Sequence, residues 1–253
     1  MNDWPVMIWA DKVEKSAMEQ IANLTTLPFL FHHLAIMPDV HTGKGMPIGG
    51  VLACTDAVIP NAVGVDIGCG MCAVKTNWHV ADISTEVMRK SIMRNIRKRI
   101  PLGKDHHKQA QDDSLLPQGH DIDRLEIVKR RQTSILKEIG TLGGGNHFIE
   151  LQKDEKGLLW IMIHSGSRNL GKQVGDYYNR KATMLNERWY SQVSPSIGLP
   201  FLPLRTKEFT DYWAEMQYCI DFALCNRSVM MMRIEEVLAD ALPGISFEQI
   251  GRA

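Results

Sequence analysis

The sequence predicts a mixed α/β protein that forms one domain. The chain has 253 residues, of which 44% are hydrophobic and 23% are charged, and this fits one large domain or two small ones. Stretches with the apolar spacing of helices alternate with short apolar runs typical of buried strands. No internal repeat and no low-complexity linker divides the chain. We therefore expect a single α/β domain over residues 1–253.

In the first half of the chain, helix and strand signals alternate. Asp11 and Glu14 form a plausible capping box at the start of a helix. A later segment carries Met88, Ile92 and Ile96 at four-residue spacing, which places one apolar face on a helix. The expected elements are a helix from Asp11 to about Leu24, strands at 33–37 and 50–55 with a loop at 38–45 between them, and a helix at 82–99.

The second half of the chain predicts three further helices and a buried strand. Gly140 follows one helical segment as a C-cap. The strand is continuously apolar until His164, which we expect at its end. Phe247 and Ile250 resemble the start of another element, so we expect a fold that is incomplete at the C-terminus. The expected elements are helices at 123–139, 172–189 and 206–242 and a strand at 158–164.

Composition points to a cytoplasmic protein. Lysine plus arginine equals aspartate plus glutamate at 29 each, so any nucleic-acid site must come from local clustering of charge. No apolar run approaches the roughly 18 residues of a membrane span, and no signal-peptide pattern is present. The five cysteines are widely spread in a chain too long to need disulfides, which suits a reducing compartment. We expect Cys72 to lie in the core.

Four side chains make a candidate metal site. Asp66 and Cys69 are three residues apart among glycines, His147 follows three glycines and Asn146, and His164 ends an apolar strand. Carboxylate, thiolate and imidazole are the side chains that bind transition metals, and this mixture favours a borderline ion such as zinc, manganese, iron or cobalt over magnesium. Taken singly, each segment is more often a tight turn or a core histidine. Together they predict a metal site.

Basic residues offer contacts for a phosphate-bearing substrate. Lys44 lies between two glycines, which permit close approach of a phosphate. Two helices also carry basic clusters, for which a solvated helix face is an equally good interpretation. The first cluster comprises Arg89, Lys90, Arg94, Arg97, Lys98 and Arg99, and the second comprises Lys129, Arg130 and Arg131.

Four motifs in this order resemble the RtcB family of RNA-splicing ligases, and Asn226–Arg227 also fits. They are PDVHTGKG at 38–45, VDIGCGM at 65–71, GGGNHFIE at 143–150 and HSGSR at 164–168. The resemblance runs over essentially the whole chain. It implies an RtcB-like α/β fold and an enzyme that uses GTP and Mn²⁺ in tRNA splicing and RNA repair. Such an enzyme joins 2′,3′-cyclic phosphate or 3′-phosphate ends of RNA to 5′-hydroxyl ends.

The resemblance also implies roles for individual residues. Asp66 would bind the first of two ions, Cys69 would bridge both and take part in catalysis, His147 would join the first ion and His164 the second. Asp39 would orient the histidine that becomes guanylylated. The GTP site would be lined by Asn146, His147, Phe148, Ile149 and Glu150, with Glu150 facing the guanine.

The chain departs from the family at its C-terminal side. No segment matches the His-Gly-Ala-Gly-Arg motif or the His-Asn pair of the family. We therefore expect the 253 residues to be the N-terminal portion of an RtcB-like catalytic domain, without the nucleophilic histidine and inactive alone as a ligase. The alternatives are a metal-dependent phosphohydrolase and a non-catalytic remnant that binds metal, nucleotide or RNA.

Overall fold

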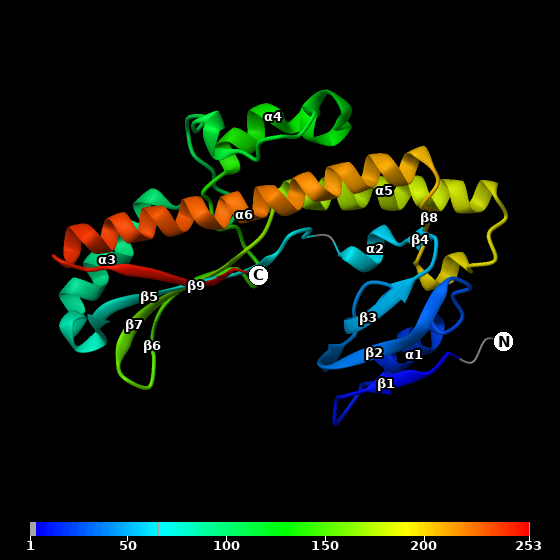
Figure 1. The fold of residues 1–253 in the computed structure, drawn as a ribbon, viewed down its shortest axis with the longest axis horizontal. Coiled ribbons are helices and arrows are strands. Elements are labelled where there is room, and N and C mark those ends of the chain that lie inside the picture. Colours follow the sequence, from blue (N-terminus) through cyan, green and yellow to red (C-terminus); the bar gives the residue numbers. More distant parts are fainter. Residues whose placement is uncertain (1–3, 65, 253) are drawn as a thin grey trace. The chain divides into compact units, whose positions relative to one another are not determined.

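The computed structural model of the chain describes residues 4–64 and 66–252, and it confirms a mixed α/β fold (Figure 1). The α-helices are α1 (Lys15–Leu24), α2 (Pro60–Val63), α3 (Glu86–Arg99), α4 (Glu126–Glu138), α5 (Arg168–Arg188) and α6 (Lys207–Ala241). The strands are β1 (Val6–Ile8), β2 (Leu30–His41), β3 (Ile48–Cys54), β4 (Ala57–Val58), β5 (Gly70–His79), β6 (Phe148–Lys153), β7 (Leu158–Ser165), β8 (Leu202–Pro203) and β9 (Phe247–Arg252). Short 3₁₀ helices lie at Val80–Ile83, Asp113–Leu115, Ile122–Arg124 and Pro195–Ile197.

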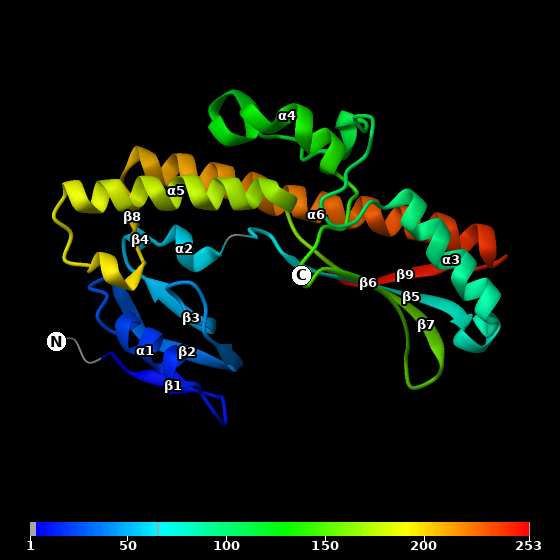
Figure 2. The same cartoon turned by 180° about the vertical axis from the view of Figure 1, so that it is seen from behind.

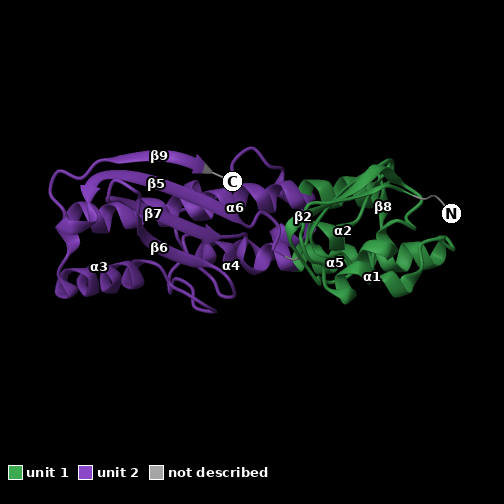
Figure 3. Ribbon diagram, turned by 90° about the horizontal axis from the view of Figure 1, so that it is seen from below, with its two compact units in different colours: residues 1–65, 173–214 green, residues 66–172, 215–253 purple. Residues whose placement is uncertain are grey.

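The chain divides into two compact units, each made from two separate stretches (Figure 3). Unit 1 comprises residues 1–65 and 173–214, and unit 2 comprises residues 66–172 and 215–253. Helices α5 and α6 contribute residues to both units. The expectation that residues 1–253 act as one domain stays a prediction.

Unit 1 is built around a small sheet in the order β1-β2-β3, in which β1 is parallel and β3 antiparallel to β2. A second, two-stranded sheet pairs β4 with β8. Apolar residues of α1 pack with Leu34 and Ile36, the inward-facing residues of β2, to form one core. Leu34 and Ile36 are buried while Ala35 between them is only half-buried, as the two-residue period of a strand predicts.

Unit 2 contains an antiparallel four-stranded sheet in the order β6-β7-β5-β9 (Figures 1 and 2). Helices α3 and α6 cover this sheet, and their apolar residues share one core with β5 and β7. The predicted face of α3 is inside, since Ile92 and Ile96 are buried and the half-buried Met88 packs against the same core. Cys72 is buried in the same core, as predicted.

Several boundaries differ from the sequence predictions. The capping box of Asp11 and Glu14 is wrong, because α1 begins at Lys15 and the Glu14 carboxylate accepts a hydrogen bond from the Thr42 amide instead. The predicted loop at 38–45 begins later, since β2 continues to His41. The element expected around Phe247 is present as β9. No helix in the described part of the chain is long and apolar enough to cross a membrane.

Candidate metal centre

The sheet of unit 2 brings the candidate ligands together. Strand β7 lies between β6 and β5, and His164 pairs with Phe148 on one side and with Met71 on the other. His147 directly precedes Phe148, and Cys69 directly precedes the first residue of β5. Because β7 is antiparallel to both neighbours in this register, the starts of β5 and β6 and the end of β7 lie at the same end of the sheet. Residues almost a hundred positions apart thus become neighbours.

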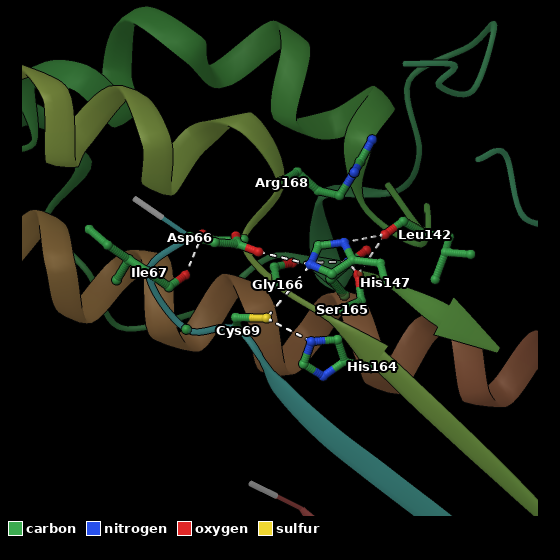
Figure 4. A network of polar contacts seen from close by, with 12 residues as sticks. Asp66, Ile67, Cys69, Leu142, His147, His164, Ser165, Gly166 and Arg168 are labelled. Atoms are coloured by element: carbon green, nitrogen blue, oxygen red, sulfur yellow. Dashed lines mark hydrogen bonds and ion pairs between the residues drawn. The ribbon is translucent and has the colours of Figure 1, made fainter. Parts of the chain in front are cut away.

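The donor atoms of these side chains converge (Figure 4). The Sγ atom of Cys69 lies 3.3 Å from Nε2 of His164 and 3.6 Å from Nε2 of His147. Donor atoms of Cys69, His147 and His164 all lie within 4.8 Å of one another. Asp66 joins them, since its Oδ2 atom is 2.8 Å from Nε2 of His147. The structure therefore assembles all four of the residues that the sequence singled out as ligands.

The separations suit a bound transition metal. Donors around a tetrahedral ion with bonds of about 2.0–2.3 Å lie roughly 3.3–3.8 Å apart, and both sulfur-to-nitrogen distances fall in that range. The second nitrogen of His147, Nδ1, lies 3.0 Å from the Leu142 carbonyl. A neutral imidazole that donates from Nδ1 keeps its Nε2 lone pair for a metal. A thiolate, two imidazoles and a carboxylate form a donor set for a borderline divalent ion.

Opposite charges meet at His147. Its hydrogen bond to the Asp66 carboxylate, followed by that to Cys69, raises the pKa of His147 to about 9. Burial, and then the charge of His147, lowers the pKa of His164. The position between Asp66 and Cys69 therefore attracts positive charge, and a divalent ion competes with a proton for it.

The turn that carries Asp66 and Cys69 packs against α6. Gly68 has φ +80°, and a Cβ atom there would lie 2.9 Å from the Cα atom of Ile220. Only glycine fits this conformation and this approach without strain. Arg227 of α6 donates from Nη1 to the carbonyls of Gly68 and Ser165, at 2.8 and 2.9 Å. One buried guanidinium thus fixes the turn before β5 to the end of β7.

A second α6 residue, Asn226, fixes the loop that leads to His147. Its side chain is fully buried, and Oδ1 accepts hydrogen bonds from the amides of Gly140 and Thr141 at 2.7 and 3.1 Å. Its Nδ2 group donates to the Thr141 and Gly166 carbonyls at 3.1 and 3.2 Å. The sequence marked Asn226–Arg227 only through the family resemblance. A polar pair within the apolar face of a long helix is the signal that could have suggested this supporting role.

Comparison with known proteins identifies the family. The family model described as "tRNA-splicing ligase RtcB" matches residues 20–125 and 118–250. The chain belongs to the RtcB family. RNA-splicing ligase RtcB1 of Escherichia coli ATCC 25922 is 34% identical over 254 residues, which cover 94% of this chain and 62% of the relative. RNA-splicing ligase RtcB of Escherichia coli K12 is 34% identical over 250 residues, covering 92% and 60%.

An archaeal member of the RtcB family matches over a similar share. The tRNA-splicing ligase RtcB of Archaeoglobus fulgidus is 29% identical over 285 residues, which cover 94% of this chain and 58% of the relative. The chain thus spans about three-fifths of the length of these RtcB relatives. The family resemblance read from the four motifs is confirmed.

The residues expected to contact GTP lie in β6 and in the turn before it, next to the candidate ligand His147 in the chain. Asn146 is exposed in the turn before β6, and Phe148 stacks on His164 with 5.7 Å between ring centroids. Ile149 and Glu150 continue along β6, and the exposed Glu150 accepts a hydrogen bond from Gln152 Nε2 at 2.6 Å. Their contact with GTP stays a prediction.

Two other predicted residues belong to unit 1. Asp39 is exposed on β2, and the Nδ1 atom of His41 lies 2.8 Å from its backbone carbonyl. Lys44 lies in the turn between β2 and β3. The roles of Asp39 in catalysis and of Lys44 in phosphate binding both stay predictions.

We expect Gly166→Ala to weaken Mn²⁺ binding by about 10- to 100-fold, the usual cost of disturbing a group that orients a metal ligand. A Cβ atom at Gly166 would lie 2.4 Å from Oδ1 of Asp66 and would push that carboxylate away from His147. Calorimetric titration with Mn²⁺ measures the change. Gly144→Ala is the matched control, because its Cβ would have no neighbour closer than 3.7 Å. Equal affinities of the two variants would contradict the assignment of Asp66.

Proposed function

We propose that residues 1–253 carry the metal centre and the guanine-contacting strand of a GTP- and Mn²⁺-dependent RNA ligase. The reaction proposed for the whole enzyme joins 2′,3′-cyclic phosphate or 3′-phosphate ends of RNA to 5′-hydroxyl ends, as in tRNA splicing and RNA repair. The convergence of Cys69, His147, His164 and Asp66 carries the proposal. The names of the relatives, RNA-splicing and tRNA-splicing ligases, supply the reaction class.

The side chains at this site would hold Mn²⁺ in defined positions. Cys69 is exposed and lies within 3.6 Å of both imidazoles, which supports a role for its thiolate as a ligand that two ions would share. Asp66 and His147 would complete one ion site and His164 the other. Bound divalent ions supply Lewis acidity and neutralise phosphate charge. Arg227 and Asn226 would keep the ligands in place through the hydrogen bonds described above.

Strand β6 would bind the nucleotide. Glu150 follows His147 by three residues and is exposed, so its carboxylate is available to accept hydrogen bonds from guanine N1–H and the exocyclic amine. Asn146, on the other side of His147, is also exposed and would contact the same nucleotide. Adenine has no N1 donor, so this arrangement selects guanine.

We expect GTP to bind more tightly than ATP, and Glu150→Ala to remove most of this preference. A paired hydrogen-bond contact to a base edge is worth about 1–3 kcal/mol of discrimination, or roughly 5- to 150-fold in affinity. Competition between labelled GTP and unlabelled ATP, in the presence of Mn²⁺, measures the ratio. Glu155→Ala, an exposed carboxylate in the next turn, should leave the ratio unchanged. An unchanged preference in Glu150→Ala would remove this residue from the guanine site.

The proposed reaction is tested with the whole gene product that carries this chain. RNA fragments with 3′-phosphate and 5′-hydroxyl ends are incubated with Mn²⁺ and GTP, and joined product is measured on gels. We expect joining that requires both cofactors and is lost in Cys69→Ala. Release of phosphate without a need for GTP would favour a metal-dependent phosphohydrolase. Metal binding without either reaction would favour a non-catalytic binding protein.

We also propose a cytoplasmic location. Cys54, Cys69, Cys219 and Cys225 form no disulfide within the described residues, which suits a reducing compartment. The proposed partner is RNA with 3′-phosphate or 2′,3′-cyclic phosphate ends and 5′-hydroxyl ends. We propose no contact with a membrane. Fractionation of cells with an antibody to the protein tests the location.

A further inference from the structure

The two basic clusters differ in how their charges are used. On and before α4, three exposed cations are each paired with a carboxylate: Arg124 with Asp121 at 2.9 Å, Lys129 with Asp123 at 2.7 Å, and Arg130 with Glu126. The remaining cation of that cluster, Arg131, pairs with the buried Glu138. Carboxylates of the same chain therefore neutralise the α4 cluster, and little positive charge remains there to bind an anionic partner.

The α3 cluster keeps much of its positive charge. Lys90 pairs with Glu86 at 2.6 Å, and Arg99 pairs with two carboxylates of α6. Arg89 donates hydrogen bonds to the backbone carbonyls of Ile83 and Ser84. The remaining three cations, Arg94, Arg97 and Lys98, are exposed and form no ion pair with any described residue. Arg94 donates a hydrogen bond to the neutral hydroxyl of Ser91, at 3.4 Å, which leaves its charge unbalanced.

These three cations lie on one face of the helix. Arg94 and Lys98 are four residues apart and Arg97 lies between them, so they are neighbours one turn apart, about 6 Å along the axis. The opposite face, with Ile92 and Ile96, is buried in the core of unit 2. Packing therefore fixes which face of α3 is presented outward.

A groove follows this charged face. It has a volume of about 590 Å³, and five α3 cations line it together with one carboxylate, Glu86, which is already paired. A neighbouring hollow of about 680 Å³ shares Arg89 and Met93 with this groove and reaches Glu150 and Lys153 on β6. The charged groove thus continues to the strand that we propose as the nucleotide contact.

We propose that the outward face of α3, carrying Arg94, Arg97 and Lys98, binds the phosphate backbone of the RNA substrate away from the ends that are joined. This inference rests on the proposed function for the identity of the polyanion. Unpaired, exposed guanidinium and ammonium groups along a groove suit a chain of phosphates, and such contacts bind without regard to base sequence. An anionic membrane fits less well, since membrane-surface helices insert a bulky apolar face that α3 instead buries in the core.

The test measures binding of a fluorescein-labelled unstructured RNA by anisotropy at increasing KCl concentrations. Three lost phosphate contacts should reduce the slope of log affinity against log salt by about 2, at roughly 0.7 per phosphate for a single strand. We therefore expect Arg94→Ala/Arg97→Ala/Lys98→Ala to lose on the order of 10- to 100-fold in affinity at 0.1 M KCl. The loss should be the same for RNA with 3′-phosphate and with 3′-hydroxyl ends. Unchanged Mn²⁺ affinity and circular dichroism would establish that the variant is folded.

A matched control removes the same number of charges elsewhere. Arg124→Ala/Lys129→Ala/Arg130→Ala changes three exposed but paired cations, and we expect its RNA affinity and salt slope to stay near those of the unmodified protein. Equal losses of RNA affinity in both triple variants would show that only the net charge of the protein matters, and would overturn the proposal. No loss in the α3 variant, or binding of α3 to phosphatidylserine vesicles but not to RNA, would also overturn it.

The outcome is separable from that of the proposed function. RNA binding that depends on α3, in a protein that joins no RNA ends, would support this surface and contradict the ligase. RNA joining with a salt slope unchanged by the α3 substitutions would support the ligase and contradict this surface.

Discussion

Cys69→Ala should abolish Mn²⁺ binding, with a loss of at least about 100-fold in affinity. Its Sγ atom lies 3.3 and 3.6 Å from the two candidate imidazoles and is the donor placed between them. Disturbing only the groups that orient ligands costs 10- to 100-fold, so removal of a bridging ligand should cost more. Elemental analysis after gel filtration and calorimetric titration both measure the loss.

Cys72→Ala is the control for this experiment. Cys72 is only three residues away but is buried in the core between the sheet and α6. Its substitution should lower stability by about 1 kcal/mol through a small cavity and leave metal affinity nearly intact. Equal losses of metal from the two variants would indicate a site shared by Cys69 and Cys72, and would contradict the centre described here.

Asn226→Ala should lower the free energy of unfolding by about 3–4 kcal/mol. The substitution leaves the amides of Gly140 and Thr141 buried without their acceptor, and each such group costs about 1–3 kcal/mol. It also removes two hydrogen bonds to buried carbonyls in the loops that carry the candidate ligands. Urea unfolding should give a lower midpoint with a similar slope.

Asn95→Ala is the matched control for stability. Asn95 is an exposed asparagine on another helix, α3, and its substitution should change the free energy of unfolding by no more than about 0.5 kcal/mol. A stability of Asn226→Ala equal to that of this control would show that the hydrogen bonds of Asn226 contribute little, and that other contacts hold the two loops.

Much of the candidate centre was predictable because the side chains that bind transition metals can be recognised from residue type alone. Asp66, Cys69, His147 and His164 were chosen as donors that are rare together, and the sheet places them within reach of one another. The predicted strand at 158–164 also places His164 correctly, as β7 ends at Ser165. A continuous apolar run strongly predicts a strand, and the polar residue after the run marks the end of that strand.

What the sequence did not predict depends on contacts between distant segments. The order β6-β7-β5-β9 is set by pairings across up to about 180 residues, which local periodicity does not encode. The role of Asn226 depends on loops some 85 and 60 residues away. The capping box at Asp11 failed for the same reason, since Glu14 binds Thr42 and not its own helix. The unequal neutralisation of the α3 and α4 cations likewise appears only in the fold.

The central claim is that Cys69, together with His147 and His164, binds a divalent metal. The most direct measurement is anomalous X-ray scattering from crystals of the protein grown with Mn²⁺. We predict a manganese peak within about 2.5 Å of the Cys69 sulfur and of at least one of the two histidine Nε2 atoms. Manganese peaks found only at other positions, with none at Cys69, would contradict the claim.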